Sequence, residues 1–309
     1  KPMAAFFAVT GLVGALPVFN VNQLTQAINY ILLEPNGVQT GFGTSLVIGI
    51  MLTIITTIVI IGGLDRISKT VSKLVPAMVL LYFVSVVAIL FVHYDVVLSY
   101  FSMIFTDAFA AENYKGDPLL GGVLGGLILL GIRRGAFSNE AGIGTATMAH
   151  GASKTSEPVR EGLIAMLGPA IDTLVVCTLT AMAILVTGVW QTEDVNGVSL
   201  TAAAFDEAIP YVGNYLLLLC ILAFSVSSLF SYSYYGTKCL SFLAGAENKK
   251  YYNYVYVLSI LVGATTSLSF ILNLIDGFFA LMAIPTMIAT LIMAPRVMKA
   301  AKIYFAKYK

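Results

Sequence analysis

The chain has 309 residues, of which 58% are hydrophobic and only 11% are charged, and its formal net charge is +1. Because soluble domains carry about 25% charged residues, this composition excludes an ordinary soluble fold, and the near-neutral charge gives no indication of nucleic-acid binding. Three cysteines, Cys177, Cys220 and Cys239, lie in apolar segments without metal-binding or redox spacing, so we expect them to pack as small apolar side chains.

Eight segments are apolar and long enough to cross a bilayer, which takes roughly 20 residues. They lie near 3–19, 41–63, 75–94, 119–153, 162–188, 213–238, 252–275 and 277–298. The sequence therefore predicts an all-α polytopic membrane protein with a single transmembrane domain over residues 1–309. Lys1 precedes the first apolar segment with no start methionine and no cleavage site, so we expect the natural N-terminus to lie upstream and find no signal peptide here.

Lysine and arginine mark one side of this membrane protein. Outside the pair at 133–134 there are 15 basic residues, and 14 of them fall at Lys1, in the loops 64–74, 149–161 and 237–251, and in the C-terminal tail. Only Lys115 lies in a loop of the opposite set. Since basic loops face the cytoplasm, the helices are predicted to alternate without a slip and the C-terminus to be cytoplasmic.

Polar side chains follow the first span at Asn20, Asn22, Gln23 and Gln26. A polar outer loop is the better explanation for Asn22 and Gln26. Asn20 and Gln23 are three residues apart and so share one face of a helix, where they can line a cavity together.

Residues 95–118 lie between the third and fourth spans. Phe101, Ile104, Phe105 and Phe109 recur there at helical spacing. The pattern predicts an amphipathic helix that lies in the outer membrane interface.

The fourth apolar segment, 119–153, contains the run Arg133-Arg134-Gly135-Ala136-Phe137-Ser138-Asn139-Glu140-Ala141-Gly142. At ~1.5 Å per residue the segment is too long for one straight span, so we predict a break in the helix within 134–143. Non-helical backbone at membrane depth is tolerated where it lines a cavity or is buried in protein, and such breaks hold substrates and ions in secondary transporters.

The charges at this break need partners. Ser138 and Asn139 can simply cap the second half of the helix, but that does not explain a carboxylate and two guanidinium groups at this depth. Ionisable residues inside membranes are functional by default. We expect Glu140 to be ionised and to pair with Arg134 or Arg133, or with another buried donor, because a lone buried charge is costly.

Three further polar features follow along the chain. Asp172 lies in the fifth span and can pair across helices or relay a proton, with pairing the safer interpretation. Asp276 lies at the junction of the last two predicted spans, where a capping role is expected. The sixth span carries a serine stripe that either packs helices or offers neutral oxygens to an alkali cation; its members are Ser225, Ser227, Ser228, Ser231 and Ser233.

The sequence resembles the alanine or glycine:cation symporter family across the whole chain. The resemblance is carried by Arg134–Gly144, by Glu157-Pro158-Val159-Arg160-Glu161-Gly162 and by Ile171–Thr178. Shorter matches in the same order are Asn20-Val21-Asn22-Gln23, Ile61-Gly62-Gly63, Ser233-Tyr234-Tyr235-Gly236 and Met282-Ala283-Ile284-Pro285. The Arg-Gly-x-Phe-Ser-Asn-Glu-Ala-Gly run is highly specific, whereas the shorter matches are weak alone.

The resemblance implies a leucine-transporter-type fold of two inverted five-helix repeats. The eight spans then correspond to core helices three to ten, and the first two core helices are expected to precede this chain. Residues 1–94 complete the first repeat, 95–118 form the outer segment, and 119–309 form the second repeat.

The resemblance also implies the site. Its substrate-facing positions are Phe137, Ser138 and Asn139 at the break, with Asn20 and Gln23 from the first span. Ser227 and Ser228 fall where the family places sodium-binding hydroxyl groups. Tyr232 stands where the family usually has tryptophan, so we expect it to cover the substrate cavity and limit side-chain size.

The leading hypothesis is Na⁺-coupled symport of a small neutral amino acid (alanine, glycine or serine) by alternating access in a bacterial or archaeal plasma membrane. The alternative is a proton-coupled amino-acid permease or a channel of the same fold. An intramembrane enzyme is disfavoured, because the sequence has neither the Gly-x-Ser-Gly of serine rhomboids nor the Gly-x-Gly-Asp of aspartyl proteases. Nothing in the sequence indicates an oligomeric state.

Overall fold

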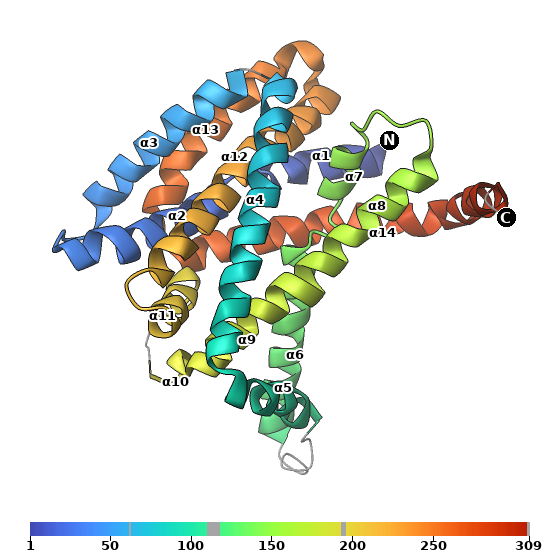
Figure 1. The fold of residues 1–309 in the computed structure, drawn as a ribbon. Helices are drawn as coiled ribbons and strands as arrows, with labels where there is room; N and C mark the ends of the chain where they lie inside the picture. The colour runs from blue at the N-terminus through green and yellow to red at the C-terminus, as the bar shows by residue number, and fades with distance from the viewer. Residues whose placement is uncertain (62, 110–117, 193–195, 308–309) are drawn as a thin grey trace.

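The computed structural model describes residues 1–61, 63–109, 118–192 and 196–307, and all regular elements in these ranges are helical (Figure 1). The first part contains α1 (Pro2–Gly14), α2 (Val18–Ile28), the short turns η1 (Asn29–Leu33) and η2 (Glu34–Asn36), α3 (Phe42–Ile61), α4 (Gly63–Val92) and α5 (Tyr94–Phe109). The second contains α6 (Pro118–Ser138), α7 (Thr145–His150), α8 (Pro158–Ala170), the π-helical turn η4 (Ile171–Cys177), α9 (Thr178–Thr187), α10 (Val189–Thr192), α11 (Val198–Ala208), α12 (Gly213–Ala244), η5 (Ala246–Asn248), α13 (Lys249–Thr265) and α14 (Leu268–Ala306).

Six helical stretches among the described residues are long and apolar enough to cross a membrane. They are Pro2–Asn36, Phe42–Ile60, Lys69–Val92, Pro158–Thr187, Gly213–Ala244 and Leu268–Ala306. The other two predicted spans behave differently, because α13 has only 17 residues and the segment 119–153 divides into α6 and α7. The prediction of an all-helical polytopic membrane protein is confirmed.

The first span is longer than the sequence predicted. After a turn at Ala15–Pro17 the chain re-enters a helix, and α2 runs from Val18 through the residues expected to form an outer loop. Asn22 is buried in α2, so its assignment to a loop was wrong. The apolar residues Val21 and Leu24 interleave with the polar ones and are fully buried, which explains why this polar-looking segment packs inside.

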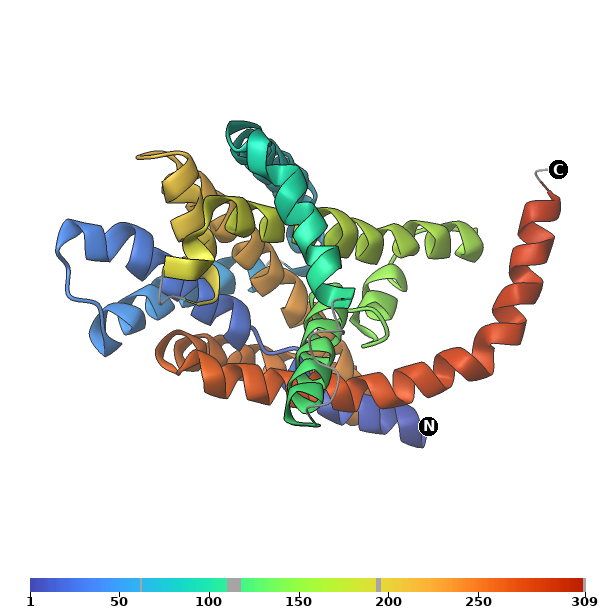
Figure 2. The same cartoon turned by 90° about the horizontal axis from the view of Figure 1, so that it is seen from below.

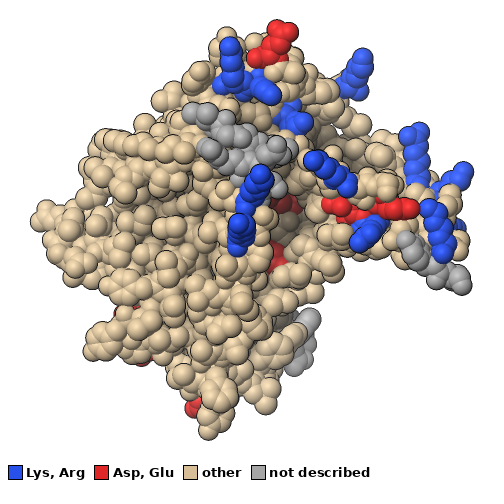
Figure 3. Space-filling model, turned by 45° about the horizontal axis from the view of Figure 1, so that its top comes forward, with Lys and Arg blue, Asp and Glu red and all other residues tan. Residues whose placement is uncertain are grey.

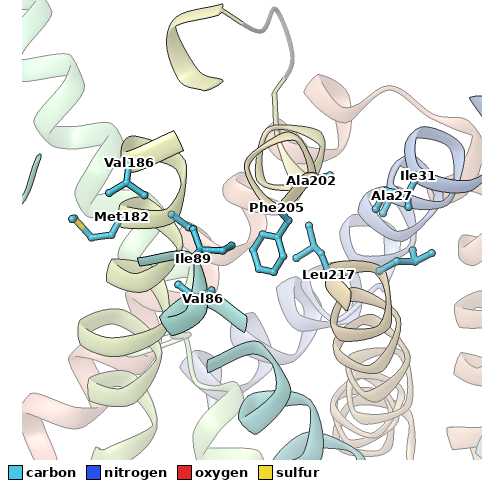
Figure 4. Close-up of a cluster of buried hydrophobic side chains, with 11 residues drawn as sticks. Ala27, Ile31, Val86, Ile89, Met182, Val186, Ala202, Phe205 and Leu217 are labelled. Carbon is cyan, nitrogen blue, oxygen red and sulfur yellow. The ribbon is translucent and has the colours of Figure 1, made fainter. Parts of the chain in front are cut away.

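α12 lies at the centre of the bundle. It packs against α1, α2, α4, α11 and α13, and in Figure 1 it runs behind α4. Around its start a buried cluster joins α2, α4, α9, α11 and α12, with Phe205 near its middle (Figure 4). Lipid is as apolar as these side chains, so close packing rather than exclusion from water stabilises such contacts between spans.

A close helix crossing brings α2 against α13. A Cβ atom on Gly263 would lie 2.8 Å from the Cα of Val18, so only glycine allows this approach. At the same crossing the Asn22 side-chain amide donates hydrogen bonds to the carbonyl oxygens of Gly263 (3.2 Å) and Thr266 (2.8 Å). Asn22 therefore satisfies carbonyl groups that the end of α13 leaves free.

The last two spans divide at a different place from the predicted one. The turn lies at Thr266–Ser267, where the backbone becomes extended, and not at Asp276. Asp276 is a buried residue inside α14, so its predicted capping role was wrong. α14 contains Pro285 and Pro295, residues that bend helices, and it curves away from the bundle toward the C-terminus (Figure 2).

Two further expectations concern the loops. α5 confirms a helix up to Phe109, but residues 110–117 of the predicted interfacial segment, which include Lys115, lie outside the described residues. In the view of Figure 3, lysine and arginine gather over the upper and right-hand parts of the surface, and none is seen at the lower left. This one-sided distribution agrees with the charge asymmetry of the sequence.

Candidate functional site

The predicted break in the fourth span is confirmed. α6 ends at Ser138 and α7 begins at Thr145. Between them Glu140 (φ 55°) and Gly144 (φ 110°) adopt left-handed backbone conformations. The backbone N–H of Ala141 donates to the side-chain oxygen of Asn139 at 2.9 Å, which is the local turn that asparagine favours. The chain is therefore folded into a short non-helical link rather than bent within one helix.

Hydrogen bonds tie the first residues of the break to the π-helical turn η4. The Ser138 hydroxyl donates to the carboxylate of Asp172 at 2.8 Å, and the Asn139 amide donates to the Thr173 hydroxyl at 2.8 Å. π-helical turns occur frequently at functional sites. On the other side, the Thr286 hydroxyl of α14 donates to the carbonyl of Ile143 at 3.1 Å. The break is thus held from two helices at once.

The carboxylate of Glu140 has a different partner from the arginines first predicted. It accepts a hydrogen bond from the Tyr232 hydroxyl of α12. The arginines instead contact the carboxylate of Asp276, with Arg133 Nε at 3.6 Å and Arg134 Nη1 at 3.3 Å. The expected pairing of Glu140 with Arg133 or Arg134 was therefore wrong. The alternative expectation, a pairing with another buried donor, is the one observed, and that donor is Tyr232.

The structure also places Phe137 differently from the prediction. Its ring packs edge-on against the ring of Phe279 at 5.6 Å between centroids and joins the buried cluster that contains Ile143 and Met282. Phe137 does not line the cavity described below. Its contacts anchor the end of α6 to α14.

A cavity of about 660 Å³ lies beside the break. Ser138 and Asp172 line one wall, and Ser227, Ser228 and Tyr232 of α12 line another. The remaining lining is mainly apolar and comes from α4, η4 and α12, including Val75, Val79, Phe83, Leu217 and Ile221. Small-molecule sites have this character, with few polar groups set in an apolar wall.

Of the two serines that line the cavity from α12, Ser227 has its hydrogen bonds defined. Ser227 is buried and its hydroxyl donates to the carbonyl of Phe224 at 2.8 Å, while its own carbonyl accepts from Ser231 at 3.0 Å. A hydroxyl that donates to a backbone carbonyl keeps its oxygen lone pairs available. Ser227 can therefore offer an oxygen to a cation from the cavity wall.

Asn20 and Gln23 do not join this cavity. Gln23 donates to Gln26 at 3.1 Å and accepts from the backbone N–H of Val198 at 3.2 Å, so it binds the start of α11. Asn20 is buried in α2. Asn20 and Gln23 share one face of α2, but this face does not line the cavity beside the break.

Two carboxylates and one hydroxyl were not assigned to the site from the sequence. Asp172 and Thr173 contact the break directly, and Asp276 neutralises its arginines. The available sequence signal was that each aspartate lies in an apolar span. The break and its partners carry two positive side chains, Arg133 and Arg134. They carry three negative ones, Glu140, Asp172 and Asp276, so the formal sum is −1.

Comparisons with known proteins identify the family. The sequence matches the model of the sodium:alanine symporter family over residues 1–309. It is 34% identical to the sodium/alanine symporter AgcS of Methanococcus maripaludis over 295 residues, which cover 94% of this chain and 63% of that protein. It is 31% identical to the probable sodium/glutamine symporter GlnT of Bacillus subtilis, over 99% of this chain and 62% of that protein.

A third relative is the sodium/proton-dependent alanine carrier protein of Bacillus sp. strain PS3, which is 29% identical over 70% of this chain and 52% of its own length. The chain thus spans 63% and 62% of the length of the first two relatives. Because the family model matches the chain from the first residue to the last, the chain belongs to the sodium:alanine symporter family.

Proposed function

We propose that this protein couples the uptake of a small neutral amino acid to the entry of Na⁺. The observation that carries the proposal is the shared cavity of about 660 Å³, whose lining includes Ser138 at the break and Ser227 and Ser228 of α12. That space is within the range of small-molecule sites. A small amino acid and an ion therefore fit together in a single compartment.

The ligand chemistry supports Na⁺ as the coupling ion. Ser227 and Ser228 provide hydroxyl oxygens, the hard neutral ligands that suit an alkali cation. The five ionisable side chains at the break, counted as charged, sum to −1. One monovalent cation brings this sum to zero, whereas a zwitterionic amino acid leaves it unchanged. The charge balance at the break therefore favours one cation bound together with a neutral substrate.

The arrangement in the membrane extends this proposal. We place the protein in a prokaryotic plasma membrane with its C-terminus in the cytoplasm, on the basis of its one-sided basic residues. The leucine-transporter-type fold, with residues 1–94 in the first repeat and 119–309 in the second, would allow alternating access around the break. Phe137 and Asn139 then act from the break as supports for the substrate position, and Tyr232 covers the cavity.

The test is uptake of labelled alanine by the native protein in proteoliposomes, with a sodium gradient compared with choline. We expect sodium-dependent uptake, and replacing both serines (Ser227→Ala, Ser228→Ala) should raise the half-saturating Na⁺ concentration about tenfold or more, which corresponds to ~1.4 kcal/mol of lost binding. Ser241→Ala is the matched control, since Ser241 lies in the same helix, donates to the carbonyl of Thr237 at 2.7 Å and is not part of the cavity lining. Unchanged sodium dependence in the double variant would assign the serine stripe to packing.

A proton-coupled permease is the second candidate. One specific observation favours it, namely the Glu140 carboxylate at the break, whose hydrogen-bond donor is a tyrosine rather than a cation. The name of one relative, the sodium/proton-dependent alanine carrier protein of Bacillus sp. strain PS3, includes both sodium and proton as coupling ions. Uptake driven by a pH gradient in sodium-free buffer would favour this candidate over the first.

A further inference from the structure

The carboxylate of Asp172 is the feature of the cavity that the proposed ion site does not use. It lies in η4 and accepts from the Ser138 hydroxyl at 2.8 Å. Its other bonded neighbour among the described residues is the thiol of Cys177, at 4.0 Å. Both partners are neutral.

The two other carboxylates at the break already have partners. Asp276 contacts Arg133 and Arg134, and Glu140 accepts from Tyr232. Among the described residues, those that line the cavity include no lysine, arginine or histidine. An ionised carboxylate in a membrane span without a cationic partner is costly, and such residues mark substrate and ion pathways. A positive group bound in the cavity would supply the partner that an ionised Asp172 lacks.

The shape of the cavity indicates which positive group this is. Asp172 and Ser138 are in contact and give the lining a polar part, whereas the lining from α4 is apolar at Val75, Val79 and Phe83. A single bare ion would leave most of about 660 Å³ empty. An amino acid carries an ammonium group and a small apolar side chain on the same carbon atom, and so matches the polar and the apolar parts of this lining at once.

We infer that Asp172 binds the α-ammonium group of the transported amino acid, with the Ser138 oxygen as a second acceptor. This inference rests on the proposed function, because it takes an amino acid as the substrate. An ammonium group has three donors, and its hydrogen bonds to a carboxylate are of the strong, charge-assisted kind. Asp172 is thus a residue that selects compounds with an amino group.

The first experiment uses the native protein and no substitution. Alanine uptake in sodium-containing proteoliposomes is measured with excess ethylamine, which is alanine without its carboxylate, or excess propionate, which is alanine without its ammonium group. We expect ethylamine to inhibit more strongly than propionate. Stronger inhibition by propionate would overturn the inference whether or not any variant folds.

The second experiment uses Asp172→Asn, with Asp172→Glu as the conservative variant. A charge-assisted hydrogen bond corresponds to about a 10- to 100-fold change in affinity, so the KM for alanine should rise by that factor in Asp172→Asn. The half-saturating Na⁺ concentration at saturating alanine should change less than about threefold. Asp172→Glu should recover part of the alanine affinity. Asp206→Asn is the control for removal of a charge, since Asp206 is exposed.

The outcomes separate this inference from the proposed function. An unchanged alanine KM in Asp172→Asn, or a loss that falls on Na⁺ affinity instead, would overturn the ammonium assignment while leaving sodium-coupled uptake in place. Absence of sodium-dependent uptake by the native protein would instead refute the proposed function itself.

Discussion

The contact between Tyr232 and Glu140 joins α12 to the break through a single hydroxyl group. Tyr232→Phe keeps the ring and removes the donor, which leaves the carboxylate without its partner. A hydrogen bond to a charged group is worth about 1.5–3 kcal/mol. We therefore expect Tyr232→Phe to unfold at a lower temperature in detergent, measured by scanning fluorimetry.

Tyr254→Phe is the control for that measurement, since the Tyr254 ring is 66% exposed. If both variants unfolded at the native temperature, the hydroxyl of Tyr232 would not hold the break.

Tyr232 also lines the cavity in which the substrate is proposed to bind. Tyr232→Trp introduces a larger ring, so glycine and alanine should be favoured over threonine and valine relative to the native protein. One methylene in an apolar pocket is worth only ~1–3 kcal/mol, so the change should be graded. Competition for labelled alanine uptake measures it, and an identical ranking in both proteins would show that Tyr232 does not set the size limit.

Individual residues were predictable where the signal is local. The sequence indicated a break from the glycines and charges of 134–143, and the structure places it at 139–144. The sequence also singled out Ser138, Ser227 and Tyr232, which the fold brings to one cavity. The sequence did not predict the partner of Glu140, because Tyr232 is 92 residues away. Spacing along one helix carries no information about which distant side chain contacts that helix.

At the scale of elements, the crossing of α2 and α13 depends on one missing side chain. A Cβ on Gly263 would press on the backbone of Val18. Overpacking typically costs 1–3 kcal/mol, so Gly263→Val should lower the unfolding temperature, as measured by scanning fluorimetry in detergent. Gly277→Ala in α14 is the control, because a Cβ there meets no atom within 4 Å; equal losses in both variants would mean that the crossing is not tight.

Element boundaries were harder to predict than element types. The sequence placed the last turn at Asp276, since a carboxylate normally ends an apolar span. The structure places the turn at Thr266–Ser267 and keeps Asp276 inside α14. A charge is tolerated there because arginines from α6 neutralise it, and that compensation exists only once the helices have packed.

Across the whole molecule, the arginine–aspartate cluster connects α6 to α14, and its residues Arg134 and Asp276 are 142 positions apart in the sequence. Asp276→Asn leaves two guanidinium groups without their carboxylate. Breaking a fully buried pair costs about 3–5 kcal/mol, and the arginine side chains are 44% and 42% exposed, so a smaller loss of stability is expected here. Limited proteolysis in detergent gives the measurement.

A neutral triple variant (Arg133→Gln, Arg134→Gln, Asp276→Asn) separates pairing from packing. Replacing a whole buried ion pair by neutral groups is often close to harmless, so this variant should resist proteolysis better than Asp276→Asn alone. A triple variant that is degraded as fast as the single one would show that the charges act independently.

The paired hydrogen bonds between the break and η4 have a mechanical consequence. Ser138 binds Asp172 and Asn139 binds the next residue, Thr173, so two adjacent positions on each side are fastened together. Sliding by one residue would cost both bonds at once. The end of α6 and the π-helical turn therefore behave as one rigid joint, and any hinge that opens the cavity has to lie outside it. Two non-helical segments can supply such a hinge: residues 140–144 of the break, and the turn between α7 and α8 at residues 151–157.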